Sequence, residues 1–151
     1  MNSILIVAHL PLAHALLQGA LHVYPDCADQ VEALDVLPHM PPEETLATAR
    51  IMLEQMHRKP GNTGVLILTD LYGATPFNVS EKLSNGIWTR LVTGANLPML
   101  VSVIDRLGQP LLALSERAMN SGRNGIIQVA VTAPQNQARR NHDQNYHDHQ
   151  Q

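Results

Sequence analysis

The chain has 151 residues, of which 44% are hydrophobic and 15% charged, and its formal net charge is -3. This length and composition indicate one domain with a single core and exclude a wholly disordered chain. The negative charge, with no basic run longer than two residues, gives no reason to expect nucleic-acid binding.

Two further features concern the compartment. The single cysteine, Cys27, cannot form an internal disulfide, which suits a reducing environment. The N-terminal apolar run, residues 4–8, is too short for a signal peptide and has no basic flank. No run reaches the ~18 apolar residues that a bilayer-spanning helix needs. We therefore expect a cytoplasmic protein without direct membrane insertion.

The first half of the chain alternates between predicted strands and helices. Residues 3–8 are apolar on both faces, as a central parallel strand requires. Pro11 fits the first turn of a helix whose apolar stripe extends to Ala20. Residues 31–37 predict a second strand, and residues 42–57 a second helix with two acidic residues in its first turn.

The second half continues the same alternation. The most hydrophobic strand candidate, residues 63–70, ends at Asp70. The later elements are expected as a helix from Thr75 or Pro76 to about residue 83, a strand over 88–93, helices over 97–107 and 110–121, and a fifth strand over 126–131. This order predicts an α/β fold, doubly wound, with a mostly parallel central sheet and helices on both faces.

The last segment, residues 133–151, is polar and rich in Gln, Asn and His, and we expect a disordered tail. Its histidines match no structural zinc pattern, and it has no cysteine.

Polar residues interrupt the apolar pattern where predicted strands end. His9 follows the first strand, Asp70 ends the third, and Asn96 follows the fourth. In open α/β sheets the carboxyl ends of the strands form the ligand-binding edge, so these residues are expected to gather there. A carboxylate beside an imidazole fixes the tautomer of the ring and stabilises positive charge on it. Such a histidine can serve as a general base, a metal ligand or a nucleophile.

The segment after Asp70 favours a phosphoryl group as the ligand. Gly73 permits a tight turn, the Thr75 hydroxyl can cap the next helix, and Pro76 fits its start. A helix N-terminus of this kind exposes backbone N–H groups that bind anions. A serine hydrolase is disfavoured, because neither Ser3 nor Ser80 lies in a G-x-S-x-G nucleophile elbow.

Two longer motifs carry a family resemblance. The chain has a strand ending in His9, followed by "TDLYGATPFN" over residues 69–78 and "TGANLPML" over residues 93–100. In this combination it resembles the enzyme IIA component of the mannose-type (mannose/fructose/sorbose) phosphoenolpyruvate-dependent sugar phosphotransferase system. The resemblance covers roughly residues 3–131, and it implies a IIA domain over residues 1–132.

The resemblance implies a phosphocarrier. His9 would accept a phosphoryl group from phospho-HPr and pass it to a IIB partner in sugar uptake, with Asp70 orienting its ring. Thr75 would contact the phosphate together with the backbone at Gly73 and Ala74. No metal and no organic cofactor are implied. The resemblance also implies a homodimer in which the last strand, residues 126–131, is exchanged or paired with the neighbouring sheet.

The active loop departs from the family pattern. Where the family usually has Thr-His-Gly, this chain has Ala8-His9-Leu10, which removes a hydroxyl and a glycine. His14, about one helical turn further on, is the next candidate acceptor.

Three alternatives remain open. The same chemistry could serve a regulatory phospho-relay without direct sugar transport, or the phosphoryl donor subunit of a dihydroxyacetone kinase. A flavodoxin-like binding module would instead hold a small molecule and carry no phosphohistidine. The sequence does not specify a sugar.

Overall fold

Four parallel strands form the centre of the structure, a computed structural model that describes residues 1–131. Along the sheet their order is β2-β1-β3-β4. The strands are β1 (Ser3–His9), β2 (Val31–Val36), β3 (Val65–Thr69) and β4 (Thr89–Thr93). The sequence-based expectation of a parallel sheet is confirmed. The predicted polar tail, residues 133–151, lies outside the described residues.

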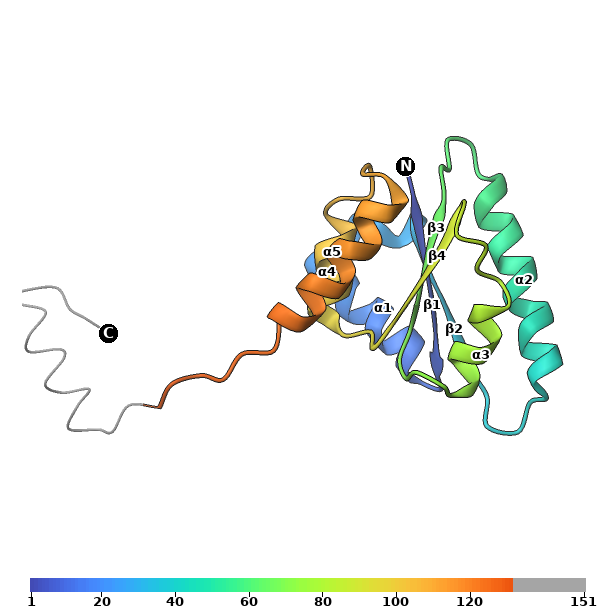
Figure 1. The fold of residues 1–151 in the computed structure, drawn as a ribbon, viewed down its shortest axis with the longest axis horizontal. Helices are drawn as coiled ribbons and strands as arrows, with labels where there is room; N and C mark the ends of the chain where they lie inside the picture. Colours follow the sequence, from blue (N-terminus) through green and yellow to red (C-terminus); the bar gives the residue numbers. More distant parts are fainter. Residues whose placement is uncertain (132–151) are drawn as a thin grey trace, which may run out of the picture.

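Helices cover both faces of this sheet, as predicted (Figure 1). On one face lie α1 (Leu12–Val23), α4 (Leu97–Ile104) and α5 (Leu111–Asn124), and on the other lie α2 (Pro42–Arg58) and α3 (Thr75–Glu81). A short 3₁₀ helix, η1 (Pro25–Asp29), precedes β2 and was not predicted. Its proline and two aspartates are turn-forming residues whose spacing gave no helical periodicity.

Strand β1 divides its side chains between two cores. Ile4, Ile6 and Ala8 pack under the face of α1, α4 and α5, while Leu5 and Val7 pack against α2 and α3. All five are fully buried, because β1 has a neighbouring strand on each side and helices above and below. The buried aliphatic surface, worth about 25 cal/mol per Å², accounts for the near-continuous hydrophobic run in this part of the sequence.

The strand order places the switch in winding direction at the centre of the sheet. The chain moves from β1 outward to β2, then returns to β3 on the other side of β1. At such a point the loops after the two strands separate and leave a crevice at their carboxyl ends. His9 is the last residue of β1, and Asp70 directly follows β3. The topology therefore brings the two predicted residues to the same edge of the sheet.

The predicted fifth strand is absent from the sheet of the single chain. Residues 126–131 follow α5 without secondary structure, and Figure 1 shows this segment leaving the body of the molecule. Ile126, Ile127, Val129 and Val131 are 74–96% exposed. Their β propensity is satisfied only where a neighbouring strand supplies the hydrogen-bond ladder. Ile126 still borders the groove beside β4, but the chain after it leaves the body of the molecule. The dimer pairing expected for this segment stays a prediction.

Candidate functional site

The structure brings His9 and Asp70 into direct contact. The Nδ1 of His9 lies 2.7 Å from Oδ2 of Asp70, and the same oxygen accepts the backbone N–H of His9 at 3.0 Å. These two hydrogen bonds from His9 to one oxygen of Asp70 hold both the imidazole ring and the end of β1 in place. The imidazole is 49% exposed, whereas the side chain of Asp70 is only 10% exposed. The pair therefore consists of an accessible ring on a buried carboxylate.

The charge state of Asp70 determines the tautomer of His9. Burial acts to raise the pKa of Asp70, but the hydrogen bonds from the ring and backbone of His9, together with the attraction between the two groups, outweigh it and hold this pKa below its ordinary value. The carboxylate is thus ionised at neutral pH and can only accept hydrogen bonds. Nδ1 must be the donor, which leaves the lone pair of the neutral ring on Nε2, the nitrogen turned away from Asp70.

The loop after Asp70 has the turn that Gly73 was predicted to permit. Gly73 has φ +82°, in the left-handed region where a side chain is strained. Helix α3 starts at Thr75, but Ala74 takes the N-cap position and no side chain caps the helix. The predicted capping role of Thr75 is therefore wrong, because the residue lies inside the first turn rather than before it. Its hydroxyl is left free for another contact.

The three predicted phosphate contacts differ in what they offer. The N–H of Ala74 already donates to the carbonyl of Leu71 at 3.3 Å. Within residues 1–131, no hydrogen bond uses the backbone N–H groups of Gly73 and Thr75. Two amides and one hydroxyl therefore remain available on this loop.

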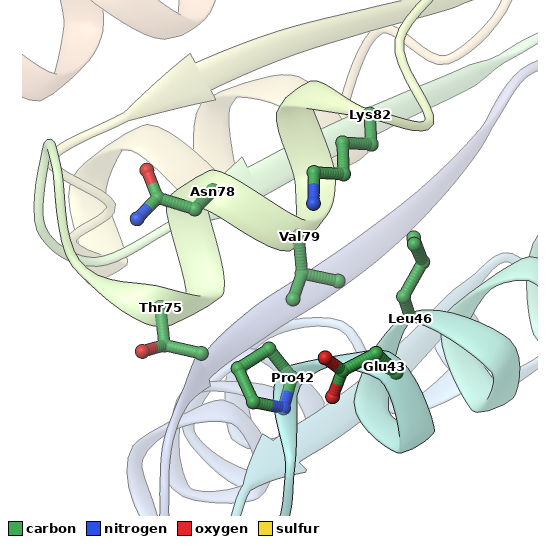
Figure 2. A pocket seen from close by; sticks show the side chains of 7 residues that line it. All are labelled: Pro42, Glu43, Leu46, Thr75, Asn78, Val79 and Lys82. Carbon is green, nitrogen blue, oxygen red and sulfur yellow. The ribbon is translucent and has the colours of Figure 1, made fainter.

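A pocket of about 230 Å³ borders the start of α3 (Figure 2). Figure 2 shows Thr75 and Asn78 on α3, and Lys82 directly after its end, lining the pocket together with Pro42 and Glu43 at the start of α2. Neither His9 nor Asp70 lines it. The histidine lies instead on an open surface, which suits a group that meets another macromolecule better than one that encloses a small molecule.

Exposed apolar side chains flank His9. Leu10 is 50% exposed, and its N–H donates to the carbonyl of Val36, which places it beside the end of β2. On the other side, Leu71 and Tyr72 follow Asp70 and are 61% and 75% exposed. The departure from the family's glycine causes no backbone strain, because within residues 1–131 no residue other than glycine has a positive φ. Ala8, where the family has Thr, is fully buried.

Asn96, the third polar residue at the sheet edge, has a structural role. Its Oδ1 accepts the N–H of Met99 at 2.9 Å and caps α4, while its Nδ2 donates to the carbonyl of Gly122 at 3.1 Å. It ties α4 to the end of α5, and its side chain makes no hydrogen bond to His9 or Asp70.

A second histidine–carboxylate pair was not predicted. The Nδ1 of His14 lies 2.7 Å from Oδ2 of Asp35. The available signal was Asp35 itself, a carboxylate near the end of β2, much as Asp70 directly follows β3. Among residues 1–131, no group of three or more His, Cys, Asp or Glu side chains is arranged to hold a metal ion. Within the same range, no helix is both long and apolar enough to span a membrane.

The fold and site together define the class of this chain, an α/β protein with a parallel sheet and an accessible, carboxylate-bound histidine at its switch point. The comparisons with known proteins narrow that class. The family model described as the PTS system fructose IIA component matches residues 3–119, so the chain belongs to the mannose/fructose-type IIA components of the sugar phosphotransferase system. The resemblance read from the sequence is thereby confirmed.

Solved structures agree with this assignment. A PTS IIA protein associated with the fucose utilization operon from Streptococcus pneumoniae is 27% identical, with a TM-score of 0.72 over 85% of this chain and 96% of that one. A phosphotransferase system component EIIA from Streptococcus agalactiae is 23% identical, with a TM-score of 0.74 over 85% and 97%. The mannose/sorbose-specific IIA subunit from Enterococcus faecalis is 20% identical, with a TM-score of 0.76 over 87% and 97%. The last two show the shared fold. Among curated proteins, no sequence matches.

Proposed function

We propose that this chain is a phosphocarrier that accepts a phosphoryl group on Nε2 of His9 from a phospho-HPr-like donor and passes it to a IIB partner in sugar uptake. The observation that carries the proposal is the contact between the half-exposed ring of His9 and the buried, ionised Asp70. This arrangement presents a lone pair to solvent and holds the ring in one orientation.

The transfer step follows from this geometry. The Nε2 lone pair attacks the phosphorus of the donor phosphoimidazole, forming a new N–P bond while the donor's N–P bond breaks and its electron pair returns to the donor ring. His9 keeps the proton on Nδ1, and the carboxylate of Asp70 stabilises the positive charge that develops on the ring. The second transfer, to the IIB partner, reverses these roles. Positioning and charge stabilisation are all that such a transfer requires of the acceptor.

The loop at the start of α3 supplies the phosphate contacts in this proposal. The free hydroxyl and N–H of Thr75 and the N–H of Gly73 would donate to phosphoryl oxygens. Ala74 would contribute less than its neighbours, because its N–H is already committed to Leu71.

The apolar side chains around His9 form the docking surface for both partners. Leu10, Leu71 and Tyr72 surround the ring with exposed apolar area, and such contiguous patches mark sites of protein association. Donor and acceptor proteins must bind here in turn, because each must bring its own histidine or equivalent group against the same nitrogen.

Residues 126–131 form a homodimer contact in the same proposal. The outer edge of β4 has no strand beside it among residues 1–131, and a groove lined by Leu91, Thr93 and Met119 extends along β4 toward Ile126. An open edge and a nearby unpaired segment of alternating apolar residues are complementary, because each lacks the hydrogen-bond ladder that the other supplies. A second copy of the chain meets both needs by symmetry.

Phosphotransfer reconstituted with enzyme I, HPr and phosphoenolpyruvate tests the proposal. We expect acid-labile phosphate on His9 of the wild type, mapped by peptide mass spectrometry at alkaline pH, and its passage to a mannose-type IIB protein. His9→Gln should abolish passage to IIB, while His39→Gln, at an exposed histidine, should leave it unchanged. An unmodified His9 in the wild type would overturn the proposal. Phosphate on His9 that passes to a dihydroxyacetone kinase and not to IIB would redirect it.

A further inference from the structure

The pair of His14 and Asp35 repeats the ring contact of the first pair, while the ring and the backbone N–H of His14 bind different oxygens of the carboxylate. The Nδ1 of His14 lies 2.7 Å from Oδ2 of Asp35, the same distance that separates His9 from Asp70. The backbone N–H of His14 also donates to that carboxylate, at 3.3 Å. The ring of His14 is 57% exposed and the side chain of Asp35 only 13% exposed. Each histidine therefore combines an accessible ring with a nearly buried carboxylate that also holds its backbone.

The two carboxylates occupy equivalent places in the sheet. Asp35 on β2 is the registered partner of Ala8, and Asp70 comes one residue after Thr69, the β3 partner of Val7. The two aspartates thus flank Ala8 from opposite sides, two strand spacings or about 10 Å apart. His9 binds the carboxylate on the β3 side, and His14, in the first turn of α1, binds the one on the β2 side.

The other described histidines lack this arrangement. His22, His39 and His57 are exposed, and within residues 1–131 none of their rings has a carboxylate partner. An exposed imidazole that is held by a carboxylate through Nδ1 presents Nε2 in a defined direction. Only His9 and His14 have that property in the described part of the chain.

Capping of α1 accounts for only part of the contact. The N-cap residue, Pro11, makes no side-chain hydrogen bond to the first turn of α1. Asp35 caps the helix instead, because its carboxylate accepts the backbone N–H of His14. That role needs one backbone hydrogen bond. It does not require the imidazole to align on the second oxygen of the same carboxylate at 2.7 Å.

We propose that His14 is a second phosphoryl-accepting histidine, with Asp35 as its positioning residue and a phosphoimidazole as its donor. The inference rests on the proposed function only for its class of donor. The Nε2 lone pair of His14 attacks the phosphorus, an N–P bond forms on His14, and the N–P bond to the donor nitrogen breaks with its electron pair returning to the donor ring. The donor is the phosphocarrier that serves His9, or phosphorylated His9 itself.

The test uses the full chain with phospho-HPr, and separately with phosphoramidate as a small N–P donor. Phosphate is located by peptide mass spectrometry, and ³¹P NMR counts the phosphohistidine signals. We expect phosphate on both His9 and His14 of the wild type, on His9 alone in His14→Gln, and on neither in the double variant. If His14 is still phosphorylated in His9→Gln, the donor transfers its phosphoryl group directly to His14. If phosphorylation of His14 requires His9, the phosphoryl group passes from His9 to His14. Both outcomes support the proposal.

A structural role is separated from a chemical one by Asp35→Asn, which keeps an oxygen to cap α1. We expect this variant to slow phosphorylation of His14 by at least about tenfold while His9 keeps its wild-type rate, because the variant removes the charge that orients and stabilises the ring of His14. His39 is the internal control for nonspecific modification. The proposal is overturned when His9 is phosphorylated and His14 is modified no faster than His39, an outcome that leaves the proposed function standing. Phosphate on His14 without any on His9 would support this inference and overturn the assignment of His9.

Discussion

At the scale of single residues, the function depends on one oxygen atom, Oδ2 of Asp70. It accepts both the ring N–H and the backbone N–H of His9, and it is ionised because those hydrogen bonds outweigh the cost of its burial. A mobile imidazole would meet a docked phosphoryl group in many orientations, whereas this one meets it in a single orientation.

Asp70→Asn is therefore expected to slow phosphoryl transfer at His9 by about 100-fold, within the range for loss of one charge-stabilising group. Asparagine retains the shape and one acceptor oxygen but removes the negative charge that stabilises the ring. The rate is measured by rapid-quench transfer from phospho-HPr. Circular dichroism should show an unchanged fold, and a transfer rate equal to that of the wild type would contradict this role of the carboxylate.

The lowered pKa of Asp70 also predicts how stability depends on pH. The pKa of Asp70 is lower in the folded chain than in the unfolded chain. Its carboxylate therefore stabilises the fold at any pH above the unfolded-state pKa, and this stabilisation is lost as the pH falls through the folded-state pKa. The difference in unfolding free energy between wild type and Asp70→Asn should thus shrink as the pH falls below the ordinary aspartate pKa of about 3.9. Urea unfolding measures this difference, with Asp29→Asn, at an exposed site, as the control variant.

At the scale of elements, the loop between β3 and α3 positions the predicted phosphate contacts. Its shape depends on Gly73, whose φ of +82° turns the chain between Asp70 and Thr75. Nothing lies within 4 Å of the place where a Cβ would be added, so a substitution there acts through backbone strain alone.

Gly73→Ala should therefore destabilise the fold by about 1–2 kcal/mol, the cost of left-handed angles for a residue with a Cβ. It should also slow transfer at His9, because relaxing the strain displaces the N–H groups of the loop. Gly108→Ala is the matched control, since Gly108 has equally open surroundings and no positive φ. Denaturant titration of both variants gives the comparison, and equal stability of the two would show that the turn tolerates a side chain.

Among the predicted elements, the strongly patterned ones were located well. The aliphatic run of β1 and the acidic first turn of α2 identified their elements from local chemistry. The helix expected over residues 97–107 ends at Ile104 instead, and the one expected over 110–121 extends to Asn124. Helix ends depend on tertiary partners such as Asn96, which ties the start of α4 to the end of α5 at Gly122.

At the scale of the whole molecule, two features lack a strand partner: the outer edge of β4 and the exposed segment 126–131, within the described residues 1–131. Each could supply the backbone hydrogen bonds that the other lacks. In the single chain they are not paired, because the segment leaves the body of the molecule after α5 (Figure 1).

The double substitution Ile127→Lys with Val129→Lys is expected to convert the proposed homodimer to a monomer, because two charges replace apolar side chains that the second copy would bury. Sedimentation velocity measures the change in mass. Ile51→Lys, at an exposed apolar position on α2, is the control that should remain dimeric. A wild type that sediments as a monomer would refute the dimer.

The sequence by itself determined the alternation of elements, the parallel sheet and the residues at its carboxyl edge. These are local properties: hydrophobic periodicity, proline and glycine positions, and a carboxylate at the end of an apolar run. Together with the family motifs they indicated His9 and Asp70 before any coordinates were considered.

Only the tertiary structure decided which groups meet. The contacts between His9 and Asp70, and between His14 and Asp35, join residues 61 and 21 positions apart through the order of strands in the sheet. The absence of the fifth strand from the single chain was decided in the same way. A strand exists only when a partner completes its hydrogen bonds, and no pattern within six residues specifies where that partner lies.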